Sequence, residues 1–579
     1  MPLDFIVDTA EKFCHSDRFF NSRSAEETCR TAEHIMREIG MEKVETLHFV
    51  SDGKISHGGW VMPLAWFPET AVLSEVSADG SETQICSYCQ QPCSLMMYSQ
   101  SADLTAELTD ADAADVSGKI VLVTDHFISI PESERVLKRG AVGIISSFLD
   151  GNYIGKPGWE YLDDVCQWCN YQLPFHQGGA KGFGFSISPR QGRALQKRLE
   201  AGEKIRLHAA VKAELRPGTL PLVTGVLPGE SDEEILLAAH LFEQGANDNA
   251  AGAAAALAVV RAFAGTKHRR SIRVMLTNEI KSLQAYVNTV NHLPDIKGGI
   301  NLDMIGVSSS FCAVLGPSAP GFPHFAVPFL ASLFQKRGCS LKINPTAGMD
   351  TVFCDPFLKV PMSFVEFMDD PDYHHSSDTP DKLNRDVLKL SFETALEFTA
   401  FLADAGAAEA LELAETAGRM DRFMPHLPDE NPAFAREVLT KTVLSVLTLT
   451  DEQEKTEVQK SLETVIAHYS CGYDGEKNSG YAELPAKWAD VYPCKNFQGL
   501  FSFEKYWLSG TLPENIAAAA GGWHAAAWIE LCFMWADGTR TVAEIYKKLT
   551  DCGMKIGITL FCDMTAFLLE ENFLVNRKL

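Results

Sequence analysis

The chain has 579 residues, enough for several domains of roughly 100–200 residues each. Its 76 acidic and 51 basic residues leave a formal net charge of −25, which argues against nucleic acid or an anionic membrane as the main partner. No apolar run is long enough to span a bilayer, and the first residues lack the basic-then-apolar pattern of a signal peptide, so we expect a cytoplasmic protein.

The fifteen cysteines are an odd number scattered over a large chain, which favours reduced thiols over a disulfide framework. Two C-x-x-C pairs, Cys86 with Cys89 and Cys166 with Cys169, could hold a structural zinc ion if the fold brought them together. We favour buried apolar thiols instead, because the long segment between the pairs imposes no local constraint.

Residues 1 to about 50 are predicted to form two amphipathic helices, with Ser24 or a neighbour as N-cap and Gly40 as a helix stop. From about residue 58 to 211 the pattern changes to short strands and turns. The strand-like runs are residues 60–63, 94–101 and 119–123, and residues 136–145 read as a helix end, a glycine stop and a strand.

Residues 236–252 read LLAAHLFEQGANDNAAG, which predicts a short strand ending at His240, a polar loop, and a buried helix to about Phe263. In α/β folds, functional groups collect at the carboxyl ends of such strands. His240 and Asp248 are both metal-ligand types. On this stretch alone, a second interpretation is equally supported, in which Asp248 or Asn249 merely caps the helix.

Three later segments favour the metal site. A strand-like run at 271–276 is followed by Glu279, and a second run at 299–306 contains Asp303. A polar turn at 372–380, DYHHSSDTP, then carries two histidines. Histidine, aspartate, glutamate, aspartate and histidine in this order, at strand ends and turns, are better explained by a metal site than by five unrelated caps or surface charges.

This order resembles the zinc aminopeptidases and carboxypeptidases with two co-catalytic metals, whose relatives include glutamate carboxypeptidase and bacterial leucyl aminopeptidases. The likeness covers roughly residues 222–402 and is carried by the GANDNAAG loop at 245–252, the NLDMIG strand end at 301–306 and the YHHSSDT turn. It is nearest to a bacterial "aminopeptidase-like" branch, which Gly348-Met349-Asp350 and Val360-Pro361 also fit.

The resemblance implies a role for each ligand-type residue. His240, Asp248, Asp303 and His374 would hold one or two zinc ions, with Asp248 as the bridge if two bind. Glu279 would be the general base. His375 is the rival of His374, but the family's histidine lies four residues before the aspartate of the turn, here Asp378.

Two positions depart from the family pattern. Phe242 stands where an aspartate would orient the first histidine, so that support is missing or comes from Glu243. Of the family's Glu-Glu pair only Glu279 is acidic, and Ile280 follows it, so Glu279 is either the base or a ligand; we favour the base. Asp350 would orient a ligand or, more simply, cap a helix.

The resemblance also implies the domain plan. We expect a mixed sheet flanked by helices, with residues 1–57 as the amino-terminal helices of the peptidase, 216–407 as its core, and 58–215 as an insert resembling the protease-associated domain. Such an insert shapes the entrance to the site and contributes no catalytic residue. Within it, the aromatic residues at 159–176 are expected to form a small satellite core, with a role at the substrate rim as the alternative.

Residues 408–579 read as a mostly helical module that ends in a helix, turn, helix and short wing, an outline typical of a winged helix. Its second helix, at 561–569, has no basic residue, so protein contact or homo-oligomerisation is expected in place of DNA binding.

The expected function is that of a zinc-dependent exopeptidase, by preference an aminopeptidase, that hydrolyses a peptide or amino-acid amide with activated water. The substrate would be a peptide or an amino-acid derivative. Two alternatives stay open: a degenerate peptidase fold acting as a binding or scaffold protein, and a hydrolase of a non-peptide amide.

Overall fold

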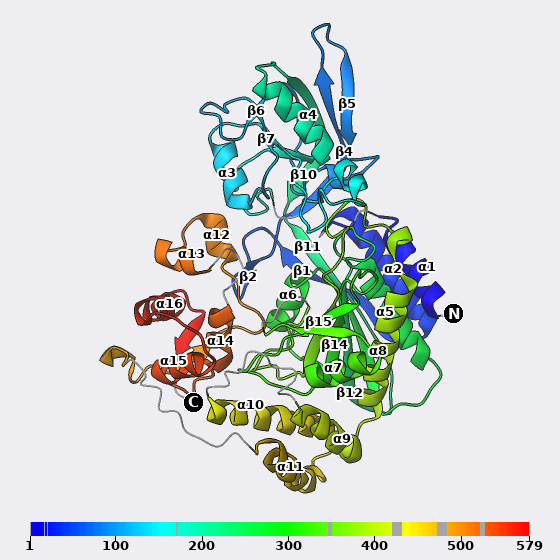
Figure 1. Ribbon diagram of the computed structural model, residues 1–579, viewed down its shortest axis with the longest axis vertical. Coiled ribbons are helices and arrows are strands. Elements are labelled where there is room, and N and C mark those ends of the chain that lie inside the picture. The colour runs from blue at the N-terminus through cyan, green and yellow to red at the C-terminus, as the bar shows by residue number, and fades with distance from the viewer. Residues whose placement is uncertain are drawn as a thin grey trace.

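The computed structural model describes residues 2–16, 18–19, 21–169, 172–345, 350–419, 431–471, 483–520 and 527–577. An eight-stranded mixed sheet lies at its centre (Figure 1). In spatial order its strands are β1 (Glu42–Ser51), β11 (Gly218–Leu227), β13 (Arg270–Thr277), β12 (Ser231–His240), β14 (Ile296–Leu302), β17 (Met362–Glu366), β15 (Cys312–Gly316) and β16 (Ser340–Ile343).

The four adjacent strands β13, β12, β14 and β17 run parallel to one another. Both faces of this part of the sheet are covered: Ile235, Leu237 and Ala239 of β12 join one apolar cluster, and Leu236 and Ala238 join another. This burial explains why β12 reads as a continuous apolar run from Ile235 to Ala239. Because the strands are parallel, their carboxyl ends lie along one edge of the sheet.

Helices cover the sheet on both sides (Figure 1). The apolar cluster on one face includes α1 (Pro2–Phe13), α2 (Arg23–Ile39), α5 (Ala250–Phe263), α7 (Ala326–Lys336) and α8 (Arg385–Asp404). The cluster on the other face includes α6 (Lys281–Thr289) and part of a second sheet. The expected fold class, a mixed α/β sheet flanked by helices, is therefore confirmed.

The amino-terminal segment differs in part from the prediction. The two helices form, Ser22 accepts the capping hydrogen bond of α2 from the Ala25 amide, and Gly40 ends the helix at φ +95°. Residues 42–51, however, form the edge strand β1, paired antiparallel with β11. The interpretation of this stretch as helix was therefore wrong. Along much of β1 the side chains alternate between exposed and partly buried, as in a strand with one face against the rest of the protein.

A second, seven-stranded sheet forms the upper lobe in Figure 1. Its strands, in spatial order, are β5 (Glu82–Ser87), β4 (Ala65–Val76), β10 (Arg206–Arg216), β6 (Ala102–Asp110), β7 (Ile120–Val123), β8 (Gly143–Ser146) and β9 (Phe183–Ser186), with helices α3 (Ile130–Lys138) and α4 (Pro189–Glu200). The strands expected at 119–123 and at the end of 136–145 are confirmed. The strand expected at 94–101 is wrong, because that buried stretch is irregular after a short 3-10 turn at Pro92–Ser94.

The carboxyl-terminal third is mostly helical and adds two short paired strands. Its elements are α9 (Ala407–Gly418), α10 (Pro432–Leu444), α11 (Lys455–Tyr469), β18 (Pro493–Lys495), α12 (Glu504–Ser509), α13 (Glu514–Ala520), α14 (Ala527–Trp535), α15 (Val542–Asp551), α16 (Ile558–Glu570) and β19 (Leu574–Asn576). These elements share one apolar cluster with the helices of the main sheet, so they pack as a continuation of the core. No helix among the described residues has both the length and the apolar character to cross a bilayer.

Candidate metal centre

Four parallel strands end in, or lead directly into, ligand-type residues at one edge of the main sheet. Across the sheet these residues are Glu279 after β13, His240 at the end of β12, Asp303 after β14 and Glu366 at the end of β17. Three of them were predicted as site residues, and Glu366 was missed. Its signal was the same as theirs, a short apolar run, MSFVE, that ends at an acid.

The loop after His240 delivers Asp248 to the same place. Asn249 caps α5, since its Oδ1 accepts from the Gly252 amide at 3.1 Å while its Nδ2 donates to the Leu302 carbonyl at 2.8 Å. A Cβ at position 252 would collide with that carbonyl, so glycine is required for this close approach. Because Asn249 does the capping, the side chain of Asp248 is available for another role.

Asp248 lies between the two histidines. Its Oδ1 is 3.1 Å from Nε2 of His240, and its Oδ2 is 3.3 Å from Nε2 of His374. Asp303 Oδ1 lies 4.0 Å from the same His240 nitrogen. The four residues predicted to hold metal are therefore brought together, although their sequence separation reaches well over one hundred residues.

The loop at 245–249, which carries Asp248, is held in place by the turn that carries His374. The carboxylate of Asp378 accepts from the amides of Asn247, at 2.8 Å, and Asp248, at 3.0 Å. A Cβ on Gly245 would strike that carboxylate, which explains the glycine in the motif. The Asn247 side chain donates to Asp370 at 2.7 Å and accepts from the Gly306 amide at 2.7 Å. The loop at 245–252 and the turn at 372–380 thus hold each other in place.

Asp350 provides the support that Phe242 cannot give to His240. One of its oxygens lies 3.6 Å from Nδ1 of His240 and accepts from the Thr277 hydroxyl at 2.6 Å. Its other oxygen accepts from the Ile280 amide at the start of α6, at 2.9 Å. Asp350 therefore takes one of its two expected roles, that of partner to a ligand-type side chain. The other expectation, a helix cap, is wrong, because the residues that follow Asp350 form turns and not a helix. Gly348 and Met349 of the same motif lie outside the described residues.

Of the two neighbouring histidines, only His374 faces the cluster. The Nε2 atom of His375 donates to the Asp150 carbonyl at 2.6 Å, and burial lowers the pKa of His375 to about 4, so its ring is neutral. The His374 ring stacks at 4.7 Å on Trp168 of the upper lobe, and the His374 carbonyl accepts from the Trp168 amide at 2.9 Å. His375 is structural, and Trp168 is buried against the site.

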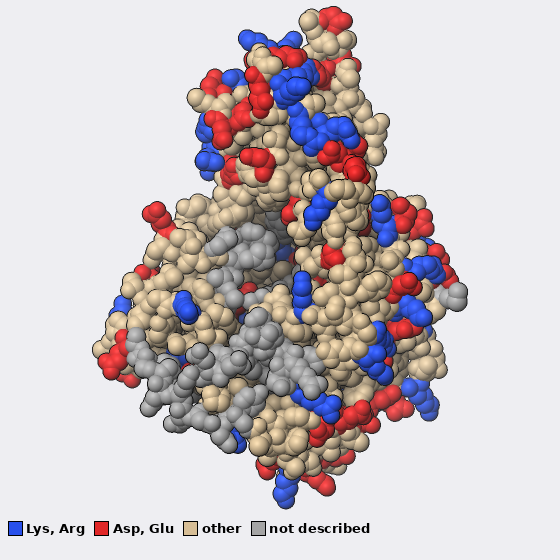
Figure 2. All heavy atoms as spheres, viewed as in Figure 1, with Lys and Arg blue, Asp and Glu red and all other residues tan. Residues whose placement is uncertain are grey.

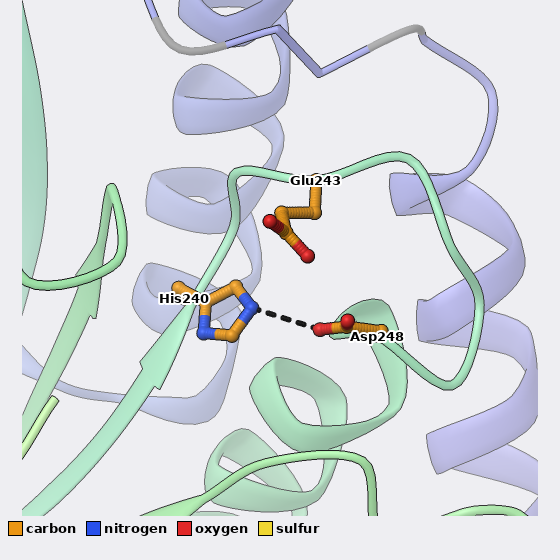
Figure 3. A group of neighbouring side chains, drawn as sticks. All are labelled: His240, Glu243 and Asp248. Carbon is orange, nitrogen blue, oxygen red and sulfur yellow. Dashed lines mark hydrogen bonds and ion pairs between the residues drawn. The ribbon is translucent and has the colours of Figure 1, made fainter. Parts of the chain in front are cut away.

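Glu243 also belongs to the site, but beside the other histidine. The sequence offers it as possible support for His240, but its ion pair is with the other histidine: its Oε2 lies 3.4 Å from Nε2 of His374. Figure 3 shows its carboxylate directed from the loop toward His240 and Asp248. One ligand-type atom from each of these three residues lies within 4.8 Å of the others, an arrangement found for no other such group in the described part of the chain.

The charges in this buried cluster are strongly coupled. Burial would lower the pKa of His240, but Asp303 and Asp248 raise it well above its usual value. Burial likewise opposes charge on His374, but Glu243 and Asp248 raise its pKa to about 10. Burial, followed by neighbouring carboxylates, raises the pKa of Glu243 and of Glu366 to about 8. The carboxylates thus outnumber the imidazoles, and a cation would relieve their repulsion.

The donor set suits zinc. It combines imidazole nitrogens with carboxylate oxygens, which are common protein ligands of this ion. In addition, one buried oxygen of Asp303 and one of Glu366 have no hydrogen-bond partner, which is unusual for a buried carboxylate. A bound cation would give these two oxygen atoms the partner that they otherwise lack.

Backbone strain is concentrated at the same place. Four of the residues with positive φ that are not glycine lie in or beside the cluster: Glu243 at +89°, Ile280 at +61°, Met304 at +47° and His374 at +57°. Such conformations cost free energy and are typical of functional sites, where they aim particular side chains. Three of the four follow the ends of parallel strands and turn the chain across the edge of the sheet.

The two C-x-x-C pairs do not form a comparable group. All fifteen cysteines are free. Cys86 and Cys169 lie near enough to Cys166 for its charge to raise their thiol pKa values, though burial has the larger effect. Within the described ranges, however, no three thiols meet the spacing seen for His240, Glu243 and Asp248.

The chain is similar to known peptidases in part of its sequence and in its fold. The model of peptidase family M28 matches residues 223–399. A candidate peptidase from Clostridium acetobutylicum has a similar structure, with a TM-score of 0.50, 14% identity, and coverage of 99% of this chain and 96% of that one.

Two further solved structures each cover 69% of this chain and 93% of their own, with 17% identity. They are the peptidase M28 precursor of Shewanella amazonensis SB2B, with a TM-score of 0.50, and a zinc aminopeptidase of Bacillus subtilis, with a TM-score of 0.49. No curated protein matches the chain. The segment 223–399, which matches the model of peptidase family M28, contains each of the ligand-type residues described above.

Proposed function

We propose that the protein is a zinc-dependent exopeptidase, and more specifically an aminopeptidase, that hydrolyses a peptide or amino-acid amide bond. The observation that carries this proposal is the position of Asp248, with one carboxylate oxygen facing His240 and the other facing His374. This arrangement lies within the segment that matches peptidase family M28.

The residues that would hold zinc are His240, Asp248 and Asp303 on one side and His374 on the other. Zinc, when bound, supplies a Lewis acid that polarises a carbonyl and lowers the pKa of water to about 7. The protein's own part is to keep these side chains in place, through Asp350 behind His240 and Asp378 behind the loop of Asp248.

Glu279 is the proposed general base. It lies at the end of β13, half-buried, where the histidines and Asp248 affect its charge. Burial raises its pKa, opposed by His240, so that it binds a proton more readily than an exposed glutamate does. In this role it would take a proton from the attacking water and deliver it to the leaving amine.

Aminopeptidase action is supported by the charge of the site. The excess of carboxylates would attract the ammonium group of a free peptide amino terminus and would disfavour a free carboxylate. We also propose the domain plan expected from the sequence, with residues 58–215 as a protease-associated-like insert that borders the site. Residues 408–579 would be a winged-helix-like module for protein contact, including contact with a second copy of the chain.

The test uses matched substrates. Amino-acid anilides or amides with a free amino group should be hydrolysed, and the same compounds acetylated on nitrogen should not. A chelator should abolish the activity, and added zinc should restore it. Hydrolysis of the acetylated compounds alone would favour a different amide hydrolase, and zinc binding without hydrolysis of a broad peptide panel would favour a scaffold.

A further inference from the structure

The side chains around Asp248 form two separate donor sets. One set contains His240 and Asp303, which face Oδ1 of Asp248 at the ends of β12 and β14. The other contains His374, which faces Oδ2 at 3.3 Å. Counting Asp248 in both, the first set has three donor residues and the second has two. The second set reaches three donors only if another side chain joins it.

Glu243 is placed to be that donor. Its Oε2 lies 3.4 Å from Nε2 of His374, almost the same distance as that of Asp248 Oδ2 from this nitrogen. The side chain is only 4% exposed, and Figure 3 shows it pointing inward from the loop. Its backbone has a positive φ of +89°, a conformation that costs free energy and is typical of functional sites.

The distances match those of ligands around a shared ion. Charge-assisted hydrogen bonds between nitrogen and oxygen measure about 2.7–2.9 Å. Two donors each about 2.1 Å from a tetrahedral zinc ion lie about 3.4 Å apart. Both separations from His374 Nε2, 3.3 Å and 3.4 Å, agree with the second value. Both separations are longer than a charge-assisted hydrogen bond and match the spacing of two ligands on one cation.

The residue that follows Glu279 cannot take this place. Ile280 is apolar, 5% exposed, and packed in the cluster that includes Phe242 and Leu283. We infer that Glu243 is the carboxylate ligand of a second zinc position, shared with His374 and the Oδ2 atom of Asp248. This inference rests on the proposed function and leaves Glu279 free for proton transfer.

The experiment is a zinc titration of metal-free, full-length protein by calorimetry, with metal analysis after dialysis. The wild type should bind two zinc ions and Glu243→Ala one. The double variant of Glu243→Ala with His374→Ala should still bind one, because both changes remove the same position. The double variant of Glu243→Ala with His240→Ala should bind none.

Two controls guard against misfolding. Glu243→Gln keeps the size of the side chain and should also lose one equivalent, while Gln244→Ala changes the neighbouring loop residue and should keep both. Circular dichroism should show the same fold in every variant. If Glu243→Ala keeps both ions with unchanged affinity, or if the wild type binds only one, the inference is wrong. A wild type that binds no zinc would overturn the proposed function as well.

Discussion

At the scale of single residues, three aspartates of the site have three different roles. Asp248 faces both histidines, Asp350 stands behind His240, and Asp378 fixes the loop amides. The first would touch metal, whereas the other two would act through the groups they hold. Substitutions that keep the size and remove the charge should separate these roles.

Asp248→Asn should lose at least one zinc equivalent, because it removes the carboxylate that faces both histidines. Asp350→Asn should keep the full number of ions with an affinity about 10–100-fold lower, the usual effect of losing a side chain that orients a ligand. Zinc titration of the two variants, side by side, checks this order. Equal retention of zinc by both would contradict the assignment of Asp248.

The sequence was sufficient to predict those site residues that have a recognisable local pattern. His240, Asp248, Glu279, Asp303 and His374 each follow an apolar run or lie in a recognisable turn, so their convergence could be predicted. The partners of Asp350 and Glu243 could not be predicted, because each is distant in the chain: His240 for Asp350 and His374 for Glu243. No local pattern specifies which buried carboxylate meets which histidine.

At the scale of elements, α6 connects the site to the carboxyl-terminal third of the chain. Its first residue, Lys281, donates to both carboxylate oxygens of Glu504 at the start of α12, at 2.6 and 2.7 Å, and to the Val61 carbonyl at 2.8 Å. Both side chains of this ion pair are 1% exposed. Glu504 also accepts from the Val61 amide, at 2.6 Å, so β3 (Trp60–Val61), α6 and α12 meet at one buried pair.

Glu504→Ala should lower the free energy of unfolding by about 3–5 kcal/mol, because it leaves the buried Lys281 ammonium without its carboxylate. The neighbouring change Lys505→Ala is the control, since the Lys505 ion pair with Glu571 is half-exposed and worth at most about 1 kcal/mol. Denaturant unfolding of both variants measures the difference. A cost for Glu504→Ala no larger than that of the control would show that the buried pair does not join these elements.

At the scale of the whole molecule, the upper lobe and the main sheet meet beside the site. The Ser376 amide donates to the Cys166 carbonyl at 2.8 Å, and Trp168 and Asp150 contact the two histidines of the turn. Figure 2 shows a hollow between this lobe and the body of the molecule. Arrangement at this scale was predictable only through resemblance, and the edge strand β1 was missed because its pairing with β11 is distant in sequence.

The upper lobe should border the site without binding its metal. In a crystal structure of the zinc-bound protein, anomalous scattering should locate the ions, and every protein ligand should come from residues 223–399. Trp168 should remain against the His374 ring. A ligand from residues 58–215 would contradict the proposed domain plan.

The central claim is that zinc and Glu279 act together in hydrolysis, and Glu279→Gln tests it most directly. The variant should bind as much zinc per chain as the wild type and hydrolyse amino-acid amides about 10²–10⁴-fold more slowly, because only the proton acceptor is lost. Metal content and rate, measured on the same preparations, give the answer. Loss of one zinc equivalent would make Glu279 a ligand, and equal inertness of wild type and variant against a broad peptide panel would contradict the peptidase itself.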